Sequence, residues 1–274
     1  MARRPRDSLV RPSANAWVRF NRTRARHPGW LSVFVEGDSW FAFPGFFDRT
    51  SIPSQLENNL DAKFAMFRVA DVGDHVREMV RGRQRRRIRD RLKNDRVDFR
   101  LLLFSGGGND LIDEFPNIIH RSSNPVDATS HINFSRLQML VDEVLVAYGE
   151  LISLRDRFRP NCWIVAHTYD RPFPDGRKVK KLGIKKGPWL QPVLRSKGVD
   201  PRFHRGISRI VMDHLGDGLM SLDNTARRVR IIDTRGILSR SGDWGDEIHP
   251  TSNGFRKISK ALRKGLHRLF PQHI

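Results

Sequence analysis

Five short runs of apolar, β-branched and aromatic residues constrain the fold of this chain more than any other feature of its sequence. Each run is bounded by turn-forming residues and is hydrophobic along nearly its whole length, without the alternation of a half-exposed strand. Runs of this kind are typical of strands in a parallel sheet that is covered on both faces. The predicted strands are Leu31–Glu36, Phe64–Ala70, Phe99–Phe104, Cys162–Ala166 and Val229–Ile232.

Segments with helical periodicity lie between or after these runs. The clearest are Phe134–Phe158, Phe203–Leu222 and Thr251–Leu269, each with an apolar stripe at helical spacing. Strands that alternate with helices predict a doubly wound, three-layer α/β/α fold around a five-stranded parallel sheet. The chain has no visible internal repeat and no convincing linker, so we expect residues 1–274 to form a single domain.

Two segments fit a minimal version of this scheme less well. Residues 1–30 are rich in arginine, and prolines at positions 5, 12 and 28 interrupt any amphipathic helix there, so we expect a basic N-terminal arm. Residues 171–200 are rich in glycine and proline and predict a long loop, a kind of segment that often serves as a lid. The sequence has no apolar h-region near its start and no run of about 18 apolar residues, which predicts a cytoplasmic protein without a membrane span.

The charge of the chain favours anionic partners. Its formal net charge is +20 and its pI is near 11.2, and such a surface attracts phospholipid headgroups, acidic polysaccharide or nucleic acid. The densest basic segment, Arg81–Arg96, holds nine Arg or Lys against two Asp. A solvated helix face is the favoured interpretation of this segment, and a specific anion-binding patch is the alternative.

Residues suited to acyl transfer follow the predicted strands. Ligands of an open α/β sheet bind beyond the carboxyl ends of its strands, so the residues that come next are the informative ones. The first strand leads into Gly37-Asp38-Ser39, the second into a segment that contains Gly73, and the third into Gly107-Gly108-Asn109-Asp110. Near the C-terminus, Asp246 precedes His249 by three residues, a spacing that lets the carboxylate reach the imidazole.

These residues supply the parts of a serine nucleophile site. His249 would take the proton from Ser39, because a serine hydroxyl is a weak nucleophile without a base. Asp246 would hold the imidazole in the required tautomer. The backbone N–H groups of Ser39 and Gly73 and the side-chain amide of Asn109 would form the oxyanion hole.

In this arrangement the chain resembles the SGNH (GDSL) hydrolases. Four family blocks are matched in order, by Gly37-Asp38-Ser39, by Gly73, by Gly107-Gly108-Asn109-Asp110 and by Asp246-x-x-His249. The resemblance implies a flavodoxin-like three-layer fold, no metal or organic cofactor, and hydrolysis of esters or thioesters through an acyl-enzyme. The first block departs from the family pattern at Trp40, which stands where leucine is usual and is a candidate substrate contact.

Several alternatives remain open at this stage. His167 follows the fourth predicted strand and is either a substrate contact or a polar strand cap. Cys162 lies in an apolar run, which favours a small buried hydrophobe over a nucleophile. The spacing of His167, His204 and His214 fits no common metal-ligand pattern, and no G-x-S-x-G motif is present.

The predicted function is ester hydrolysis, with the ester itself open. A lipid or phospholipid acyl group, a small acyl ester and an O-acetyl group on a glycan all suit the predicted site. The competing function is that of a basic nucleic-acid-binding protein on a hydrolase scaffold, which the charge favours. No known nucleic-acid-binding motif accompanies that charge, and a pure binding protein would not need Ser39, Asn109, Asp246 and His249.

Overall fold

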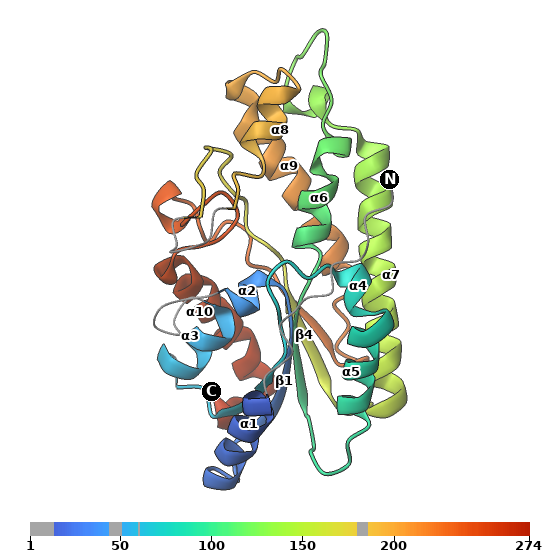
Figure 1. The fold of residues 1–274 in the computed structure, drawn as a ribbon, viewed down its shortest axis with the longest axis vertical. Helices are drawn as coiled ribbons and strands as arrows, with labels where there is room; N and C mark the ends of the chain where they lie inside the picture. The colour runs from blue at the N-terminus through green and yellow to red at the C-terminus, as the bar shows by residue number, and fades with distance from the viewer. Residues whose placement is uncertain (1–13, 44–50, 60, 180–185) are drawn as a thin grey trace.

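The computed structural model describes residues 14–43, 51–59, 61–179 and 186–274. Its centre is a five-stranded sheet in the order β2-β1-β3-β4-β5, and every neighbouring pair is parallel (Figure 1). The strands are β1 (Leu31–Gly37), β2 (Phe64–Arg68), β3 (Leu101–Ser105), β4 (Trp163–His167) and β5 (Val229–Ile232). All five predicted strands are therefore present, and none of their ends differs from the predicted one by more than two residues.

Helices cover both faces of the sheet, as the sequence predicts (Figure 1). One face carries α3 (Ile52–Asn59) and α10 (Ser252–Leu269), which pack against each other. The other layer is built around α7 (Phe134–Phe158), against which four further helices pack: α4 (Val76–Met79), α5 (Gly82–Leu92), α6 (Gly108–Ile118) and α9 (Pro201–Met220). Two short helices, α2 (Ser39–Ala42) and α8 (Gln191–Ser196), lie in the connections.

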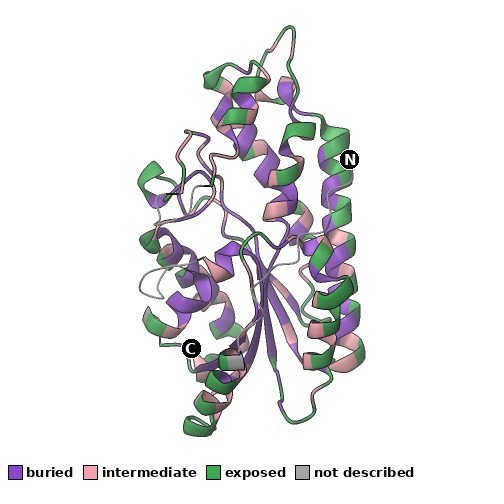
Figure 2. Cartoon of the chain, in the orientation of Figure 1, coloured by how far each residue is buried: buried purple, intermediate pink, exposed green. Residues whose placement is uncertain are grey.

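Burial explains why the strands read as continuous hydrophobic runs. The sheet is buried on both faces between the helical layers, while the outer helical faces are exposed (Figure 2). In β3 every residue is buried, and in β1 only Ser32 is partly exposed. The thiol of Cys162 is likewise buried and unpaired with any other cysteine, and burial raises its pKa to about 12. The interpretation of Cys162 as a small buried hydrophobe is confirmed.

The expectation that residues 1–30 hold no helix is wrong for part of that segment. Residues 14–26 form helix α1 (Ala14–Arg26), and residues 1–13 lie outside the described chain. Phe20 of this helix is buried, and the Trp17 ring meets that of Phe67 edge-on at a centroid distance of 4.9 Å. The prolines at positions 12 and 28 flank this helix and do not interrupt it, so its apolar side can pack against β2.

The predicted long loop at residues 171–200 is partly helical. Helix α8 occupies Gln191–Ser196, and residues 180–185 lie outside the description. Outside α8, Glu247 accepts backbone N–H groups of this segment from Gly176, Trp189 and Leu190. Helix α5 covers most of the basic segment Arg81–Arg96, and its Ile88 and Leu92 are buried.

Candidate active site

The turn between β1 and α2 presents Ser39 at the carboxyl edge of the sheet. Gly37, at the end of β1, pairs with Ser105 of β3, and a Cβ atom at Gly37 would lie 2.8–2.9 Å from backbone and side-chain atoms of Ser105. Only glycine permits this close approach. The next residue, Asp38, caps α2 by accepting a hydrogen bond from the Trp40 N–H at 3.0 Å. Ser39 is thereby fixed as the first residue of the helix.

The Asp38 carboxylate also connects the end of β1 to the end of β3 and to the segment that follows β4. It accepts hydrogen bonds from the Ser105 hydroxyl at 2.8 Å and from the Tyr169 hydroxyl. Asp38 and both partners are buried, and burial raises the pKa of Tyr169 well above its usual value, so its phenol stays a neutral donor. These bonds hold the turn that carries Ser39 against the ends of β3 and β4.

Ser39, His249 and Asp246 form a continuous chain of polar contacts. The His249 Nε2 lies 2.9 Å from the Ser39 Oγ, and the His249 Nδ1 lies 2.9 and 3.0 Å from the two Asp246 oxygens. One Asp246 oxygen also accepts the backbone N–H groups of Ile248 and His249 at 3.0 and 2.9 Å. Because Asp246 can only accept, Nδ1 carries the proton and Nε2 is left to accept from the serine hydroxyl.

Two aromatic rings fix the orientation of the His249 imidazole. Phe43 stacks on it at a centroid distance of 4.3 Å, and Trp189 meets it edge-on at 5.6 Å. Phe43 follows α2, and Trp189 belongs to the 171–200 segment. The sequence did not predict either contact, since both residues are distant from His249 along the chain.

Asn109 faces the same pocket as Ser39, whereas Gly73 does not line that pocket. The Asn109 side-chain amide donates one hydrogen bond to the backbone oxygen of Asp74 at 2.9 Å. An amide nitrogen carries two hydrogens, so the bond to Asp74 leaves the second N–H of Asn109 unused. Gly73 lies beside Asp74 in the exposed turn after β2, in the left-handed region with φ of +87°.

The adjacent Asp110 of α6 binds the start of α4. Its fully buried carboxylate accepts the Val76 N–H at 2.9 Å and the Arg77 Nε–H at 2.8 Å. Sequence reasoning assigned no task to Asp110 beyond completing the third block. The structure gives it one, because Asp110 holds the start of α4 while the preceding Asn109 side chain holds Asp74 in the turn before it.

A pocket of about 370 Å³, open to solvent, lies over Ser39 and Asn109. Its lining is mainly apolar, with a few polar side chains that include Ser39 and Asn109. The lining residues are Asp38, Ser39, Trp40, Gly108, Asn109, Ile112, Tyr169, Asp170, Pro172, Met212, Trp244 and Ile248.

The two candidate substrate contacts have different positions. Trp40 lines the pocket, and its indole N–H donates to the Ile248 oxygen at 3.2 Å. His167 is fully buried and does not line the pocket; its Nδ1 lies 2.7 Å from the Thr168 oxygen, and its ring stacks on Trp40. Burial lowers the pKa of His167 and keeps it neutral. The structure favours packing over substrate contact for His167.

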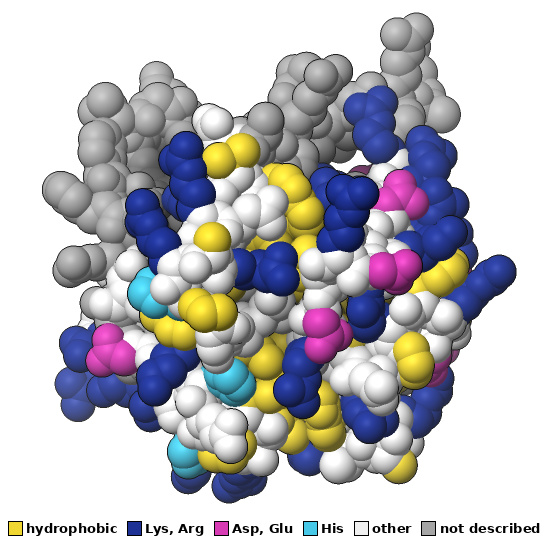
Figure 3. All heavy atoms as spheres, turned by 90° about the horizontal axis from the view of Figure 1, so that it is seen from below, with side chains coloured by type: hydrophobic (Ala, Val, Ile, Leu, Met, Phe, Trp, Pro, Cys, Tyr) yellow, Lys and Arg dark blue, Asp and Glu magenta, His cyan; other side chains and the backbone are white. Residues whose placement is uncertain are grey.

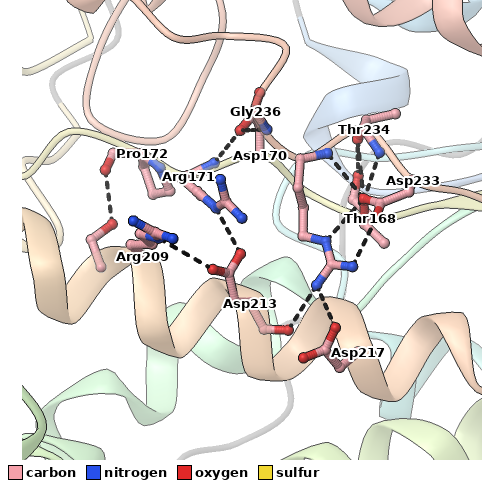
Figure 4. Close-up of polar contacts among 12 residues, drawn as sticks. Thr168, Asp170, Arg171, Pro172, Arg209, Asp213, Asp217, Asp233, Thr234 and Gly236 are labelled. Carbon is pink, nitrogen blue, oxygen red and sulfur yellow. Dashed lines mark hydrogen bonds and ion pairs between the residues drawn. The ribbon is translucent and has the colours of Figure 1, made fainter.

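A polar network at the ends of β4 and β5 supports one wall of the pocket (Figure 4). The buried Asp170 carboxylate accepts the Gly236 N–H at 2.7 Å, and the Arg171 guanidinium donates to Asp213 of α9 at 2.7 Å. The Pro172 oxygen accepts the Ser208 hydroxyl at 2.8 Å. The segment that carries Asp170 and Pro172 in the pocket wall is thus bound to the loop after β5 and to α9.

Sequence reasoning missed Glu247, which lies between Asp246 and His249 in the chain. Its side chain is fully buried and accepts backbone N–H groups of Gly176 at 3.0 Å, Leu190 at 2.7 Å and Gln191 at 3.0 Å, and also that of Trp189. One carboxylate therefore holds both described parts of the 171–200 segment. The only sequence signal was a second acidic residue directly after Asp246.

We expect Glu247→Gln to loosen this segment. The amide group of glutamine would face backbone donors, and each buried donor left without an acceptor costs about 1–3 kcal/mol of stability. The free energy of unfolding, measured by urea denaturation, should fall by at least that amount, and kcat should fall because Trp189 no longer holds the His249 ring. Glu150→Gln, at an exposed site on α7, is the control and should change stability by less than about 0.5 kcal/mol. Equal stability of both variants would contradict this role of Glu247.

Two other classes of site find no support among the residues described. No group of three or more His, Cys, Asp or Glu side chains in the described ranges is placed to hold a metal ion. None of the described helices is long and apolar enough to cross a membrane.

No model of a known protein family matches the sequence, and no curated protein matches it significantly. Solved structures are similar in fold. A lipase from a goat rumen metagenome has a TM-score of 0.54 at 16% identity, with 85% of this chain and 96% of that chain covered. An extracellular lipase from Streptomyces rimosus has a TM-score of 0.50 at 13% identity, with 85% and 99% covered. A Bacteroides ovatus protein described as a GDSL-like lipase has a TM-score of 0.54 at 10% identity, with 89% and 55% covered. The parallel sheet, its strand order and these similarities together show that the chain has the fold of the SGNH (GDSL) hydrolases.

Proposed function

We propose that the chain is a serine-dependent ester hydrolase with Ser39 as nucleophile, His249 as general base and Asp246 as the group that orients the imidazole. The observation that carries this proposal is the chain of contacts from Ser39 through His249 to Asp246, at 2.9 Å for each link. All three side chains are almost fully buried, yet Ser39 lines an open pocket. This arrangement gives a serine hydroxyl a base, an oriented tautomer and access to substrate.

The reaction runs in two balanced halves. The Ser39 Oγ attacks the carbonyl carbon of the ester while its proton passes to the His249 Nε2. His249 then gives that proton to the leaving alkoxide, which departs as an alcohol and leaves an acyl-enzyme. A water molecule next attacks the acyl carbon, with His249 taking its proton and returning it to the Ser39 Oγ, and the carboxylic acid is released.

Three N–H donors stabilise the developing oxyanion in this proposal. The Ser39 N–H is one of the first in α2, where helix N–H groups have no acceptor within the helix. The remaining amide N–H of Asn109 faces the same pocket. The Gly73 N–H is the third donor predicted from the sequence, and its neighbour Asp74 is bonded to Asn109. Removal of one such donor typically lowers kcat by about 100–1000-fold.

The apolar lining of the pocket supports an ester with an apolar acyl or alcohol group. Ile112, Pro172, Met212, Trp244 and Ile248 offer hydrocarbon surface beside the nucleophile. We propose a carboxylic or thioester of this kind, from small acyl esters to lipid acyl chains. A panel of p-nitrophenyl esters of increasing chain length decides where within that range the best substrate lies.

Fluorophosphonate labelling tests the proposed nucleophile. The purified protein should react with a fluorophosphonate probe, and peptide mass spectrometry should locate the adduct on Ser39. The labelled protein should lose its activity toward the ester panel, since the probe occupies the hydroxyl that attacks the substrate. Absence of both labelling and hydrolysis of every ester in the panel would refute the proposal.

A further inference from the structure

Helix α10 carries a row of cations along its exposed side. Arg256, Lys260, Lys264 and Arg268 follow one another at intervals of four residues, and all four are exposed. Residues four apart lie on the same face of a helix, one turn above the other. The segment Ser252–Leu269 contains no acidic residue at all. We call these four residues the α10 row.

The α10 row has no counter-charge among the residues that the structure describes. No ion pair or side-chain hydrogen bond joins any of its four members to the rest of the described chain. Lys257 of the same helix lies off the row and differs, because it pairs with Asp243 at 2.6 Å. Like charges four residues apart destabilise a helix, so the row repels itself until an anion binds.

The basic segment Arg81–Arg96, which the sequence singled out, is less available. Arg87 is bound to the buried Glu36 at 3.0 Å, Arg89 to Asp90 at 2.8 Å, and the Arg91 guanidinium lies 4.4 Å from the ring centre of Trp17. Several of its cations therefore serve the structure of the protein itself. Among the described residues, the longest row of cations without ion pairs is on α10, a helix that the sequence did not single out for its charge.

The shape of the α10 row favours a linear polyanion over a lipid surface. The apolar side of α10, with Phe255, Ile258, Leu262 and Leu266, is buried in the core, and no exposed large hydrophobic residue belongs to this helix. Helices that bind bilayers insert an apolar face, and α10 has none to offer. Lys and Arg also outnumber Asp and Glu on the molecular surface seen from below (Figure 3), so any test must separate the row from the general charge.

We propose that the α10 row binds the phosphodiester backbone of nucleic acid without reading its sequence. From Arg256 to Arg268 the helix rises about 18 Å, at about 1.5 Å per residue. One DNA strand presents a phosphate about every 3.4 Å along the duplex axis, so the row is about as long as five base-pair steps. This binding does not depend on the proposed hydrolase function, because no member of the row contributes to the candidate active site.

The test measures binding of a fluorescein-labelled 20-base-pair DNA duplex by anisotropy at potassium chloride concentrations from 50 to 200 mM. The row variant replaces Arg256, Lys260, Lys264 and Arg268 by glutamine. The control variant replaces Arg81, Arg85, Arg86 and Arg96 by glutamine, four exposed residues of the basic segment, so both variants lose the same charge. Thermal unfolding and fluorophosphonate labelling check that each variant is folded.

We expect the row variant to bind at least about tenfold more weakly at 100 mM salt, and the control variant to stay within about threefold of the unmodified protein. Loss of four phosphate contacts should reduce the log–log salt slope by about 3.6. Equal losses in the two variants would show bulk charge alone and overturn the proposal, as would failure of the unmodified protein to bind DNA. Lys260→Glu alone is a second variant for the case in which the fourfold change unfolds, and it should also weaken binding. Tighter, row-dependent binding to heparin or to vesicles with 30% phosphatidylserine would overturn the choice of nucleic acid.

Discussion

Replacement of Ser39 by alanine is expected to lower kcat for ester hydrolysis by about 10⁴–10⁶-fold while the protein stays folded. The change removes only the hydroxyl, whose one described partner is the His249 Nε2. The backbone of α2 is held by the Asp38 cap and by the bonds of Asp38 to Ser105 and Tyr169, none of which the change affects. Nucleophilic catalysis should therefore be lost without a comparable loss of stability.

The measurement compares Ser39→Ala, His249→Ala and the double variant in the same ester assay, with thermal unfolding as the check on folding. If Ser39 and His249 act as one unit, the double variant should lose no more activity than either single variant. Additive losses would mean that the two side chains act separately. More than about 1% of the original kcat in folded His249→Ala would transfer the role of base to another group and sink the assignment.

Replacement of Gly37 by alanine is expected to lower the free energy of unfolding by about 2–5 kcal/mol, from strain of the backbone and from overpacking. Gly37 has a φ of +155°, and a Cβ atom there would lie 2.8 Å from the Ser105 oxygen and 2.9 Å from the Ser105 nitrogen. Those atoms belong to the backbone of the neighbouring strand, so they cannot move aside like the end of a flexible side chain. The expected consequence is separation of β1 from β3 next to Ser39.

Urea denaturation provides the measurement, and Gly149→Ala provides a matched control. Gly149 lies in α7, and a Cβ atom there would meet nothing within 4 Å. The same chemical change should stabilise the protein by about 0.5–1 kcal/mol at that helical position. If Gly37→Ala were also neutral or stabilising, the close approach of the two strands would not be a constraint on the site.

The parts of the fold that depend on local pattern were predictable from the sequence. Helix α7 has the predicted ends, Phe134 and Phe158, because its apolar stripe is long and its neighbours along the chain break the period. Helix α1 could not be predicted in the same way, because prolines near it in the sequence argue against a helix. Its apolar side, with Trp17 and Phe20, becomes evident only from its packing against β2. Helix α6 contains Pro116, a residue that usually argues against a helix interior.

In the candidate site, too, residues that belong to local sequence patterns could be predicted, and residues that depend on long-range contacts could not. Four residues could be selected from the sequence: Ser39 and Asn109 because each follows a predicted strand, and Asp246 and His249 because they precede the last predicted helix. The sheet order brings the strands that lead to Ser39 and Asn109 side by side, and the contact of His249 with Ser39 adds the C-terminal pair to the same edge. Glu247 could not, because its partners are backbone N–H groups 56 to 71 residues away and leave no mark on the sequence. The contacts of the Phe43 and Trp189 rings with His249 also join residues that are far apart in the sequence, so they could not be predicted either.

The bonds of Glu247 join parts of the chain that are synthesised at different times. Gly176, Trp189, Leu190 and Gln191 leave the ribosome well before residue 247, and their backbone N–H groups have no other acceptor among the described residues until that carboxylate is made. We therefore expect this segment to reach its native position only after residue 247 has been synthesised. Asp246 and His249 lie within two residues of Glu247 in the chain. We expect His249, the proposed base, and the segment that Glu247 binds to reach their native positions together, long after Ser39 has been synthesised.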